Sequence, residues 1–357
     1  MQSSNPNIGI DTPAFDAFLL VSFGGPEQMD DVMPFLENVL RGKNVPHERM
    51  VEVAHHYEQF GGVSPINEQN RELLDALRAE FRDRNLKLPI YWGNRNWNPL
   101  LADTLRQMRD DGIKHALAFF TSAYSSYSGC RQYREDIARA QAEVGEGAPQ
   151  VSLIRKFYNH PGFILPNAEN VRLALEEIAP ERRAAAQVAF TAHSIPMGMA
   201  NNSQYVAQLN DACALVATEV GSPPWKLVFQ SRSGPPSQPW LAPDIGEHLR
   251  DLHAAGVTDV VVAPIGFISD HLEVLFDLDT EAQQLAAELG MTMIRAATAG
   301  THPAFVSMIY ELVVERTKGS ANKRAMGERG PSHDVCPVDC CLPGVGRPAP
   351  AAAGATS

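Results

Sequence analysis

Short apolar stretches alternate with longer amphipathic stretches along most of this chain, and this alternation constrains its fold more than any other feature. The apolar stretches are rich in β-branched and aromatic residues, which favour strands. Eight strands are expected, at residues 18–23, 88–93, 115–122, 151–157, 187–193, 226–231, 259–266 and 291–296. Helical patterns lie between or after them, at residues 70–84, 101–113, 167–178, 203–220, 244–256 and 280–290. Strands that alternate with helices form parallel sheets covered on both faces, which predicts an α/β protein.

The expected strands divide the chain into two halves, because four precede residue 158 and four follow it. A chain of 357 residues is long enough for two lobes. We expect an N-terminal lobe at residues 14–157 and a C-terminal lobe at residues 158–320. A flexible N-terminus at residues 1–13 and a Gly-, Pro-, Ala- and Ser-rich tail at residues 321–357 with a disordered end would flank them. No internal repeat is strong enough to divide the chain further.

Composition limits the classes of partner. The formal net charge of −12 argues against nucleic acid as the main partner, since a phosphate backbone demands basic surface. The N-terminal stretch lacks the features of a signal peptide, and the apolar runs are too short to cross a bilayer. We therefore expect a cytoplasmic protein without a membrane span, and a monomer, because no long apolar interface helix remains unassigned. Clustered cysteines in a reducing cytosol are more often metal ligands than disulfides.

The stretch TAHSIP places His193 at the end of the fifth expected strand. Ligands of open α/β sheets bind beyond the carboxyl ends of the strands. A neutral imidazole there can accept a proton near neutral pH or bind a metal. For an isolated histidine, a structural hydrogen bond at a strand end is the commoner role.

Three carboxylates follow the seventh expected strand at successive spacings of four: Glu273, Asp277 and Glu281. Asp270 can cap the helix that would carry them. Like charges at this spacing repel one another, so the row suits a cation in transit or loosely held. The alternative is a solvated acidic helix face, but the apolar residues that flank the row make full exposure less expected.

Two Gly-Gly turns complete the candidate site. SFGGP at residues 22–26 follows the first strand, and YEQFGGVSPIN at residues 57–67 adds the hydroxyl of Ser64. Glycine allows a ligand to approach the backbone closely. Each turn by itself indicates no more than a turn, because neither has the full dinucleotide fingerprint.

Taken together, these motifs make the chain resemble ferrochelatases, over roughly residues 14–315. The shared motifs are, in order, SFGGP, LRGKNVP, HYEQFGGVSPIN, GNRNW, TAHSIP, FQSRSGPPSQPWLAPD and GFISDHLEVLFDLDTE. Within the family the chain is most similar to the actinobacterial form, which acts on coproporphyrin III. The resemblance implies two Rossmann-like lobes of the class II chelatase type, each with a mostly parallel four-stranded sheet flanked by helices. The active-site cleft would lie between the lobes.

The implied activity is insertion of ferrous iron into coproporphyrin III in haem biosynthesis, a lyase reaction. The resemblance makes His193 and Glu273 the catalytic pair, facing each other across the macrocycle and handling the substrate iron. Asp277 and Glu281 would continue outward as a metal path. The family's helix is wound unusually wide here, which would hold carboxylates four residues apart in line. Which member of the pair takes the pyrrole protons stays open.

The resemblance also implies how the porphyrin is held. Apolar walls would come from Phe23, Trp97 and Tyr124. Donors to the propionates would be Arg41, Tyr57, Ser64 and Ser231. The chain departs from many Gram-positive relatives at two positions: Phe23 replaces a tyrosine that can ligate iron, and His56 replaces an arginine. These departures leave the axial ligand and the outer metal site open.

Three of the five cysteines lie in the tail, in HDVCPVDCCLPG at residues 333–344. Actinobacterial ferrochelatases carry a 2Fe–2S cluster on C-terminal cysteines and one internal cysteine, so the resemblance implies such a cluster on Cys336, Cys340 and Cys341. The fourth ligand is Cys130 or Cys213. We favour Cys130, because neighbouring arginines favour its thiolate, whereas Cys213 lies on the apolar side of a helix. Four thiolates could equally hold zinc.

Other functions remain as alternatives. A protoporphyrin IX ferrochelatase would differ only in its substrate. A cobalt or nickel chelatase acting on another tetrapyrrole is less expected, since short cobalt chelatases place histidine in the metal row. A tetrapyrrole carrier without catalysis would not need both His193 and Glu273. Transient contact with other haem-pathway enzymes is also expected.

Overall fold

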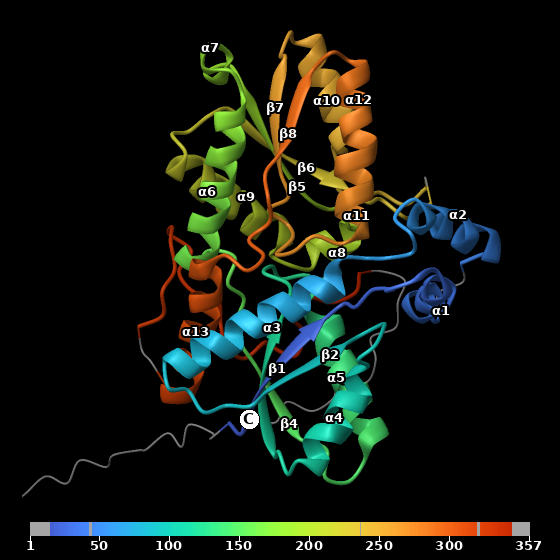
Figure 1. Cartoon of the computed structure of the whole chain (residues 1–357), viewed down its shortest axis with the longest axis vertical. Helices are drawn as coiled ribbons and strands as arrows, with labels where there is room; N and C mark the ends of the chain where they lie inside the picture. Colours follow the sequence, from blue (N-terminus) through green and yellow to red (C-terminus); the bar gives the residue numbers. More distant parts are fainter. Residues whose placement is uncertain (1–14, 43–44, 236, 320–321, 345–357) are drawn as a thin grey trace, which may run out of the picture.

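The computed structural model describes residues 15–42, 45–235, 237–319 and 322–344, so the expected flexible N-terminus and disordered end lie outside the described residues. The prediction of an α/β protein with two parallel four-stranded sheets is confirmed (Figure 1). The first sheet has the order β2-β1-β3-β4, with β1 at Ala17–Ser22, β2 at Ile90–Asn94, β3 at His115–Phe120 and β4 at Gln150–Leu153. The second has the order β6-β5-β7-β8, with β5 at Gln187–His193, β6 at Trp225–Gln230, β7 at Asp259–Ala263 and β8 at Thr292–Arg295.

The two sheets share one topology, which the sequence does not reveal as a repeat. In each sheet the first strand lies between the second and the third, and the fourth is at the edge. Handedness of the crossovers and burial of both faces restrict the order of parallel strands, and many unrelated apolar sequences meet these demands. The repeat is therefore present in the fold without a matching pattern of residues.

Thirteen α-helices and two π-helices are described. The α-helices are α1 Met29–Leu40, α2 His47–Glu58, α3 Ile66–Asp83, α4 Leu101–Asp110, α5 Gln132–Val144, α6 Pro161–Glu177, α7 Pro180–Arg183, α8 Met197–Asn201, α9 Tyr205–Glu219, α10 Ile245–Ala254, α11 Leu272–Val274, α12 Gln283–Glu288 and α13 Pro303–Lys318. The π-helices are η1 Tyr127–Arg131 and η2 Leu275–Ala282. None of the helices in the described residues is long and apolar enough to cross a membrane.

All six expected helices are present, but α1, α2, α5 and α13, and the short helices α7 and α8, were not predicted. Helix α13 packs against both α3 and α6, so it is apolar around much of its circumference and lacks a clear amphipathic stripe. Helices α1 and α2 pack mainly on each other, beside the sheets (Figure 1). The main packing partner of each is therefore a helix and not a strand, so the alternation of strands and helices does not predict them.

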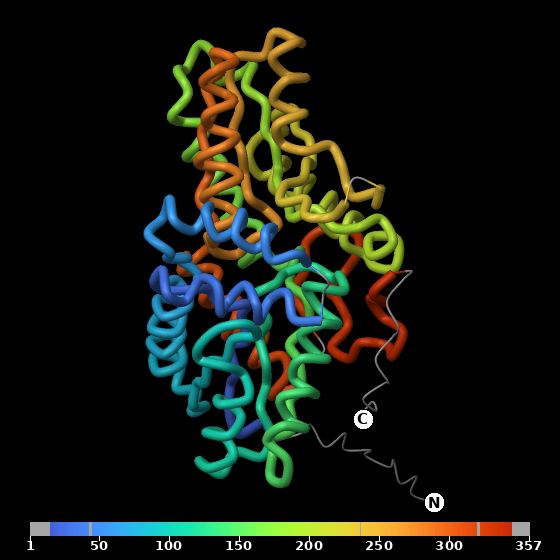
Figure 2. Tube along the Cα trace, turned by 90° about the vertical axis from the view of Figure 1, so that its right-hand side faces the viewer, coloured from blue at the N-terminus to red at the C-terminus, as the bar shows by residue number. Residues whose placement is uncertain are grey.

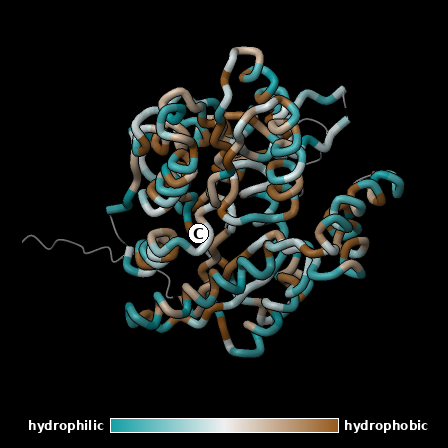
Figure 3. The backbone as a smooth tube through the Cα atoms, turned by 45° about the horizontal axis from the view of Figure 1, so that its top comes forward, coloured by the Kyte–Doolittle hydropathy of each residue, from teal (hydrophilic) through white to brown (hydrophobic). Residues whose placement is uncertain are grey.

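The largest core joins the two sheets. Phe18 and Phe119 of the first sheet belong to the same buried cluster as Phe190 of the second. Helices α3, α6, α9 and α13 fill the space between the sheets, and hydrophobic stretches lie mostly inside the molecule (Figure 3). The division of the chain at residue 158 stays a prediction. The described part of the tail runs along the junction of the two halves (Figure 2).

Candidate active site

His193 is the last residue of β5, and the structure places its imidazole beside Glu273. Nε2 of His193 lies 3.7 Å from a carboxylate oxygen of Glu273, and the two side chains are 34% and 51% exposed. Nδ1 of His193 contacts the carbonyl oxygen of Ser194, and the hydroxyl of Tyr205 donates to the His193 carbonyl at 3.0 Å. A carbonyl can only accept, so Nδ1 donates in this contact and Nε2 is the ring nitrogen that faces Glu273.

The expected placement of Glu273 across the macrocycle from His193 does not agree with this distance. An aromatic ring sandwiched between two groups needs about 3.5–4.0 Å on each face, or about 7 Å between the groups. The observed 3.7 Å leaves no room for a porphyrin between them. A porphyrin between the two groups would therefore require these partly exposed side chains to move apart.

Glu273 lies in the short helix α11, whose first turn is capped differently from the prediction. His271 is the N-cap, and its Nδ1 accepts from the backbone N–H of Glu273 at 3.2 Å. Asp270, which was expected to cap the helix, instead pairs with Arg295 through two contacts of 3.2 Å. The prediction for Asp270 was wrong because Arg295 of β8, distant in sequence, competes for the carboxylate. Sequence reasoning also missed His271, although it lies two residues before Glu273.

The carboxylate row continues on η2, and its wide winding agrees with what the family resemblance implies. Asp277 accepts hydrogen bonds from the Ser231 hydroxyl and from Nε2 of Gln230, the latter at 3.3 Å. Burial, followed by the nearby charges of Glu273 and Glu281, raises the pKa of Asp277 to about 7. Ser231 was expected to donate to a propionate, but here its hydroxyl serves Asp277.

Aromatic side chains form a cluster at the edge of the site, on α1, α2 and the loops after β1 and β2. The ring of Phe35 makes edge-on contacts with the rings of Phe23, Tyr57 and Trp97, at centroid distances of 6.2, 6.1 and 6.3 Å. Phe23 is 36% exposed and can offer a face to a ligand. Burial, and then the charge of Glu273, raises the pKa of the Tyr57 phenol. Phe35, at the centre of the cluster, was not identified from the sequence.

The remaining predicted substrate contacts lie in different surroundings. Tyr124 is 2% exposed and donates to the carbonyl of Ile265 at 2.9 Å, so its ring is packed inside the protein. Arg41 is exposed at the end of α1 and binds the side chain of Asn38. Ser64, which follows the second Gly-Gly turn, is buried against Gly25 of the first. The ring of His56 stacks on Phe276 with a centroid distance of 3.9 Å, which docks α2 onto η2.

The tail brings its cysteines to Cys130, which lies in η1. The sulfur of Cys130 is 3.9 Å from that of Cys336, and the sulfurs of Cys340 and Cys341 are 3.4 Å apart. Nδ1 or Nε2 of His333 and the sulfurs of Cys336 and Cys340 lie within 4.8 Å of one another. Cys213 is fully buried in the large core instead. Arg131 holds the tail by donating to the carbonyls of Val338 and Cys340 at 2.7 and 3.3 Å.

Comparison with known proteins finds relatives that match nearly the whole chain. The family model for ferrochelatases matches residues 15–317. A protein of Rhodopirellula baltica named ferrochelatase is 62% identical over 331 residues, which cover 92% of this chain and 94% of that protein. A coproporphyrin III ferrochelatase of Streptomyces griseus is 51% identical over 369 residues, covering 97% and 98%.

Among solved structures, SirB from Bacillus subtilis with Fe3+ has a TM-score of 0.50 at 13% identity, covering 87% of this chain and 98% of that one, and shows a shared fold. The family model and the relatives both span nearly all of the described residues, from the first strand to the last helix. The chain therefore belongs to the ferrochelatase family.

Proposed function

We propose that this chain inserts ferrous iron into coproporphyrin III to form Fe-coproporphyrin in haem biosynthesis. One observation carries the proposal: Nε2 of His193 lies 3.7 Å from the Glu273 carboxylate, at the head of a row of carboxylates. The choice of porphyrin follows the relatives named coproporphyrin III ferrochelatase, at 51% and 50% identity. We further propose that the enzyme acts in the cytoplasm as a monomer and contacts other haem-pathway enzymes transiently.

The residues present match the balance of the reaction. Each insertion releases two pyrrole protons and brings in one divalent cation, so the porphyrin core remains neutral. Nε2 of His193 and the carboxylate of Glu273 would provide two proton acceptors, 3.7 Å from each other. Asp277 and Glu281 provide the hard oxygen ligands that an incoming ferrous ion can exchange for water. The iron in this scheme is a substrate.

The aromatic cluster would receive the macrocycle. Phe23 and Trp97 present rings at the rim of the site, and Phe35 fixes both from behind. A flat apolar ring is held by such faces through area burial and ring contacts. Arg41 lies exposed near this cluster, at the end of α1, where its guanidinium can pair with a propionate.

The experiment that tests the function is anaerobic incubation with Fe(II) and coproporphyrin III. We expect the porphyrin bands to collapse into a metalloporphyrin spectrum, with a higher kcat/KM than for protoporphyrin IX. Faster conversion of protoporphyrin IX would favour the alternative substrate. Turnover with cobalt or nickel alone would make the chain a different chelatase, and tight pigment binding without conversion would make it a carrier.

We also propose a 2Fe–2S cluster on Cys130, Cys336, Cys340 and Cys341. Four tetrahedral sulfurs around one metal lie about 3.8 Å apart, given metal–sulfur bonds of about 2.3 Å. Two sulfur pairs, at 3.9 and 3.4 Å, are close to this spacing, as a centre with two sulfurs on each iron requires. The sulfurs of Cys336 and Cys340, one from each pair, also lie within 4.8 Å of each other, so the spacing suits one zinc ion as well, and the choice of a cluster rests on the family resemblance. When bound, the cluster would join the tail to the first sheet.

The C336S variant tests this proposal. We expect wild-type protein purified anaerobically to absorb in the visible range and to contain two iron and two sulfide per chain, because such a cluster has that composition. C336S should lose both, since three thiolates remain. The control is C213S, whose thiol is 0% exposed in the core and is not among the sulfurs that meet near Cys130. One zinc ion per chain without sulfide would contradict the cluster and show that the cysteines hold a structural zinc ion instead.

A further inference from the structure

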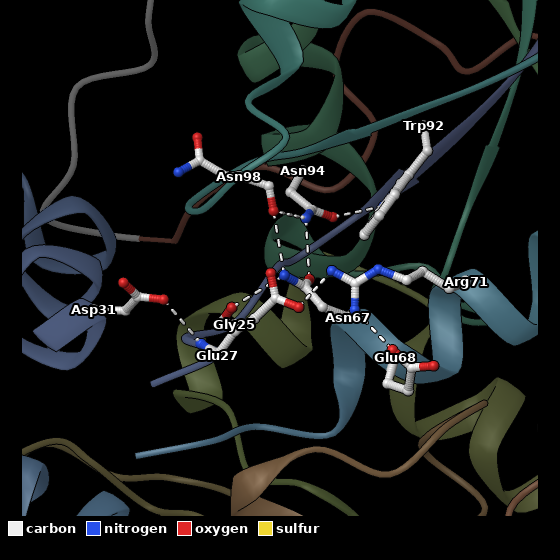
Figure 4. A network of polar contacts seen from close by, with 9 residues as sticks. All are labelled: Gly25, Glu27, Asp31, Asn67, Glu68, Arg71, Trp92, Asn94 and Asn98. Carbon is white, nitrogen blue, oxygen red and sulfur yellow. Dashed lines mark hydrogen bonds and ion pairs between the residues drawn. The ribbon is translucent and has the colours of Figure 1, made fainter. Parts of the chain in front are cut away.

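A buried polar network joins three loops at the edge of the first sheet (Figure 4). The loops are residues 23–27 after β1, residues 64–67 at the start of α3, and residues 94–99 after β2. Asn67 and Asn94 occupy its centre, and both are 0% exposed. Nδ2 of Asn67 donates to the carbonyls of Gly25 and Asn98, each at 3.2 Å. One amide therefore ties all three loops together.

Asn94 completes the network from the second strand. Its Nδ2 donates to Oδ1 of Asn67 at 3.1 Å and to the carbonyl of Asn98 at 2.9 Å, and its Oδ1 accepts from Nε1 of Trp92 at 2.9 Å. All four amide hydrogens of the two asparagines are thus used. A fully satisfied buried network specifies one arrangement of its members, because any shift leaves a polar group without a partner.

Close backbone packing leaves the loops little freedom around this network. A Cβ on Gly24, whose φ is +81°, would lie 2.8 Å from Cβ of Asn94, and a Cβ on Gly25 would lie 2.7 Å from Cβ of Ser64. Arg71 closes the outer side, since it pairs with Glu27 and Glu68 and lies 5.7 Å from the Trp92 ring centroid (Figure 4). Both glycines of the SFGGP motif are therefore required by contacts with the other two loops.

The loops carry the residues that would touch the porphyrin. The first holds Phe23, whose carbonyl accepts from the backbone N–H of Asn96 at 3.1 Å, and the third holds Trp97. Nδ2 of Asn38 on α1 donates to the carbonyl of Asn96 at 3.2 Å, which links the network to the aromatic cluster. His193 and Glu273 belong to the second sheet and its helix, so they share no contact with the two asparagines in this network.

We propose that Asn67 and Asn94 are positioning residues for the porphyrin. They hold the loops that carry Phe23, Ser64 and Trp97 at one spacing, and so set the affinity for the macrocycle without acting on the metal or the protons. The identity of the ligand rests on the proposed function. Loss of either amide leaves buried carbonyls without donors, and the loops move apart to recover hydrogen bonds with water.

The test compares N67L with N70L, two variants of the same helix. We expect N67L to raise the KM and the Kd for coproporphyrin III about tenfold, with kcat within twofold of wild type, because it removes binding and spares the reacting pair. Asn70 is 2% exposed and its Nδ2 has no hydrogen-bond partner, so N70L should leave KM and Kd unchanged. A purely structural network would lower thermal stability and the active fraction but leave the KM of N67L at the wild-type value, and that result would overturn the proposal.

A second readout does not depend on turnover. Hydrogen exchange of peptides that cover residues 23–27 and 94–99 should become faster in N67L and stay unchanged in N70L. N94D, which keeps the shape of Asn94 and removes its two donated hydrogen bonds, replaces N67L if that variant does not fold. Unchanged exchange in both loops would reject the positioning role whatever the substrate is. Wild-type protein that fails to convert coproporphyrin III would reject the proposed function instead.

Discussion

The H193A variant should lose about 10³-fold in kcat for iron insertion, while its Kd for coproporphyrin III stays within about threefold of wild type. Proton transfer by a positioned base contributes about 10²–10⁴ to rate. Nε2 of His193 lies 3.7 Å from Glu273, and the His193 ring is not part of the aromatic cluster that would hold the porphyrin. Stopped-flow insertion and quenching of porphyrin fluorescence measure the two quantities separately.

The matched control is H253A, since His253 is exposed near the end of α10 and remote from the carboxylate row. It should behave as wild type in both assays. Near-normal turnover of H193A would remove His193 from the reaction. If His193 and Glu273 act on the same step, the double variant H193A/E273Q should lose little more than the worse single variant, because residues that act as a unit are not additive.

The D277N variant should be more stable than wild type at pH 8 and slower in iron insertion. Burial raises the pKa of Asp277 from an ordinary value of 3.8 to about 7. The folded protein therefore binds more protons than the unfolded chain between these pH values, and stability falls as pH rises through them. Above pH 7 the ionised carboxylate costs up to about 4 kcal/mol of folding free energy, for a shift of about three pKa units. Asparagine has no ionised form and avoids this cost.

Denaturant unfolding of D277N and wild type at pH 5, 6, 7 and 8 checks the sign. The stability advantage of D277N should grow with pH up to about pH 7 and then stay constant. E288Q is the control, because Glu288 is exposed on the next helix, and its advantage should stay near zero. A constant advantage of D277N at all pH values would show that ionisation is not its cause. Loss of a carboxylate from the row should also raise the KM for Fe(II), since one hard oxygen ligand is removed.

Local pattern predicts most of the fold. Each of the eight strands could be recognised because a buried parallel strand needs a short run of apolar residues, wherever its neighbours lie. Helix α13 could not, because its residues are buried between α3 and α6 and show no single apolar face. The core that joins the two sheets could not be predicted either, since the spacing of strands along the chain does not show which faces of the two sheets pack together.

The candidate site was likewise predicted in part from the sequence. The motifs around His193 and Glu273 indicated both residues before any geometry was known, and the wide winding of η2 followed from the resemblance. The motifs could not show that Asp270 pairs with Arg295, nor that Ser231 and Gln230 hold Asp277. Each of these contacts joins a carboxylate to a residue from a separate strand or loop, distant in sequence.

By itself, then, the sequence determined the alternation of strands and helices and the family, and it pointed to His193 and Glu273, because periodicity and motifs are properties of neighbouring residues. Only the tertiary structure decided that Nε2 of His193 lies 3.7 Å from the Glu273 carboxylate and that Cys130, and not Cys213, meets the tail across 206 positions of sequence. It also decided that Asn67 and Asn94 close a network among three loops. Such distances depend on how separate elements pack, and no local pattern encodes them.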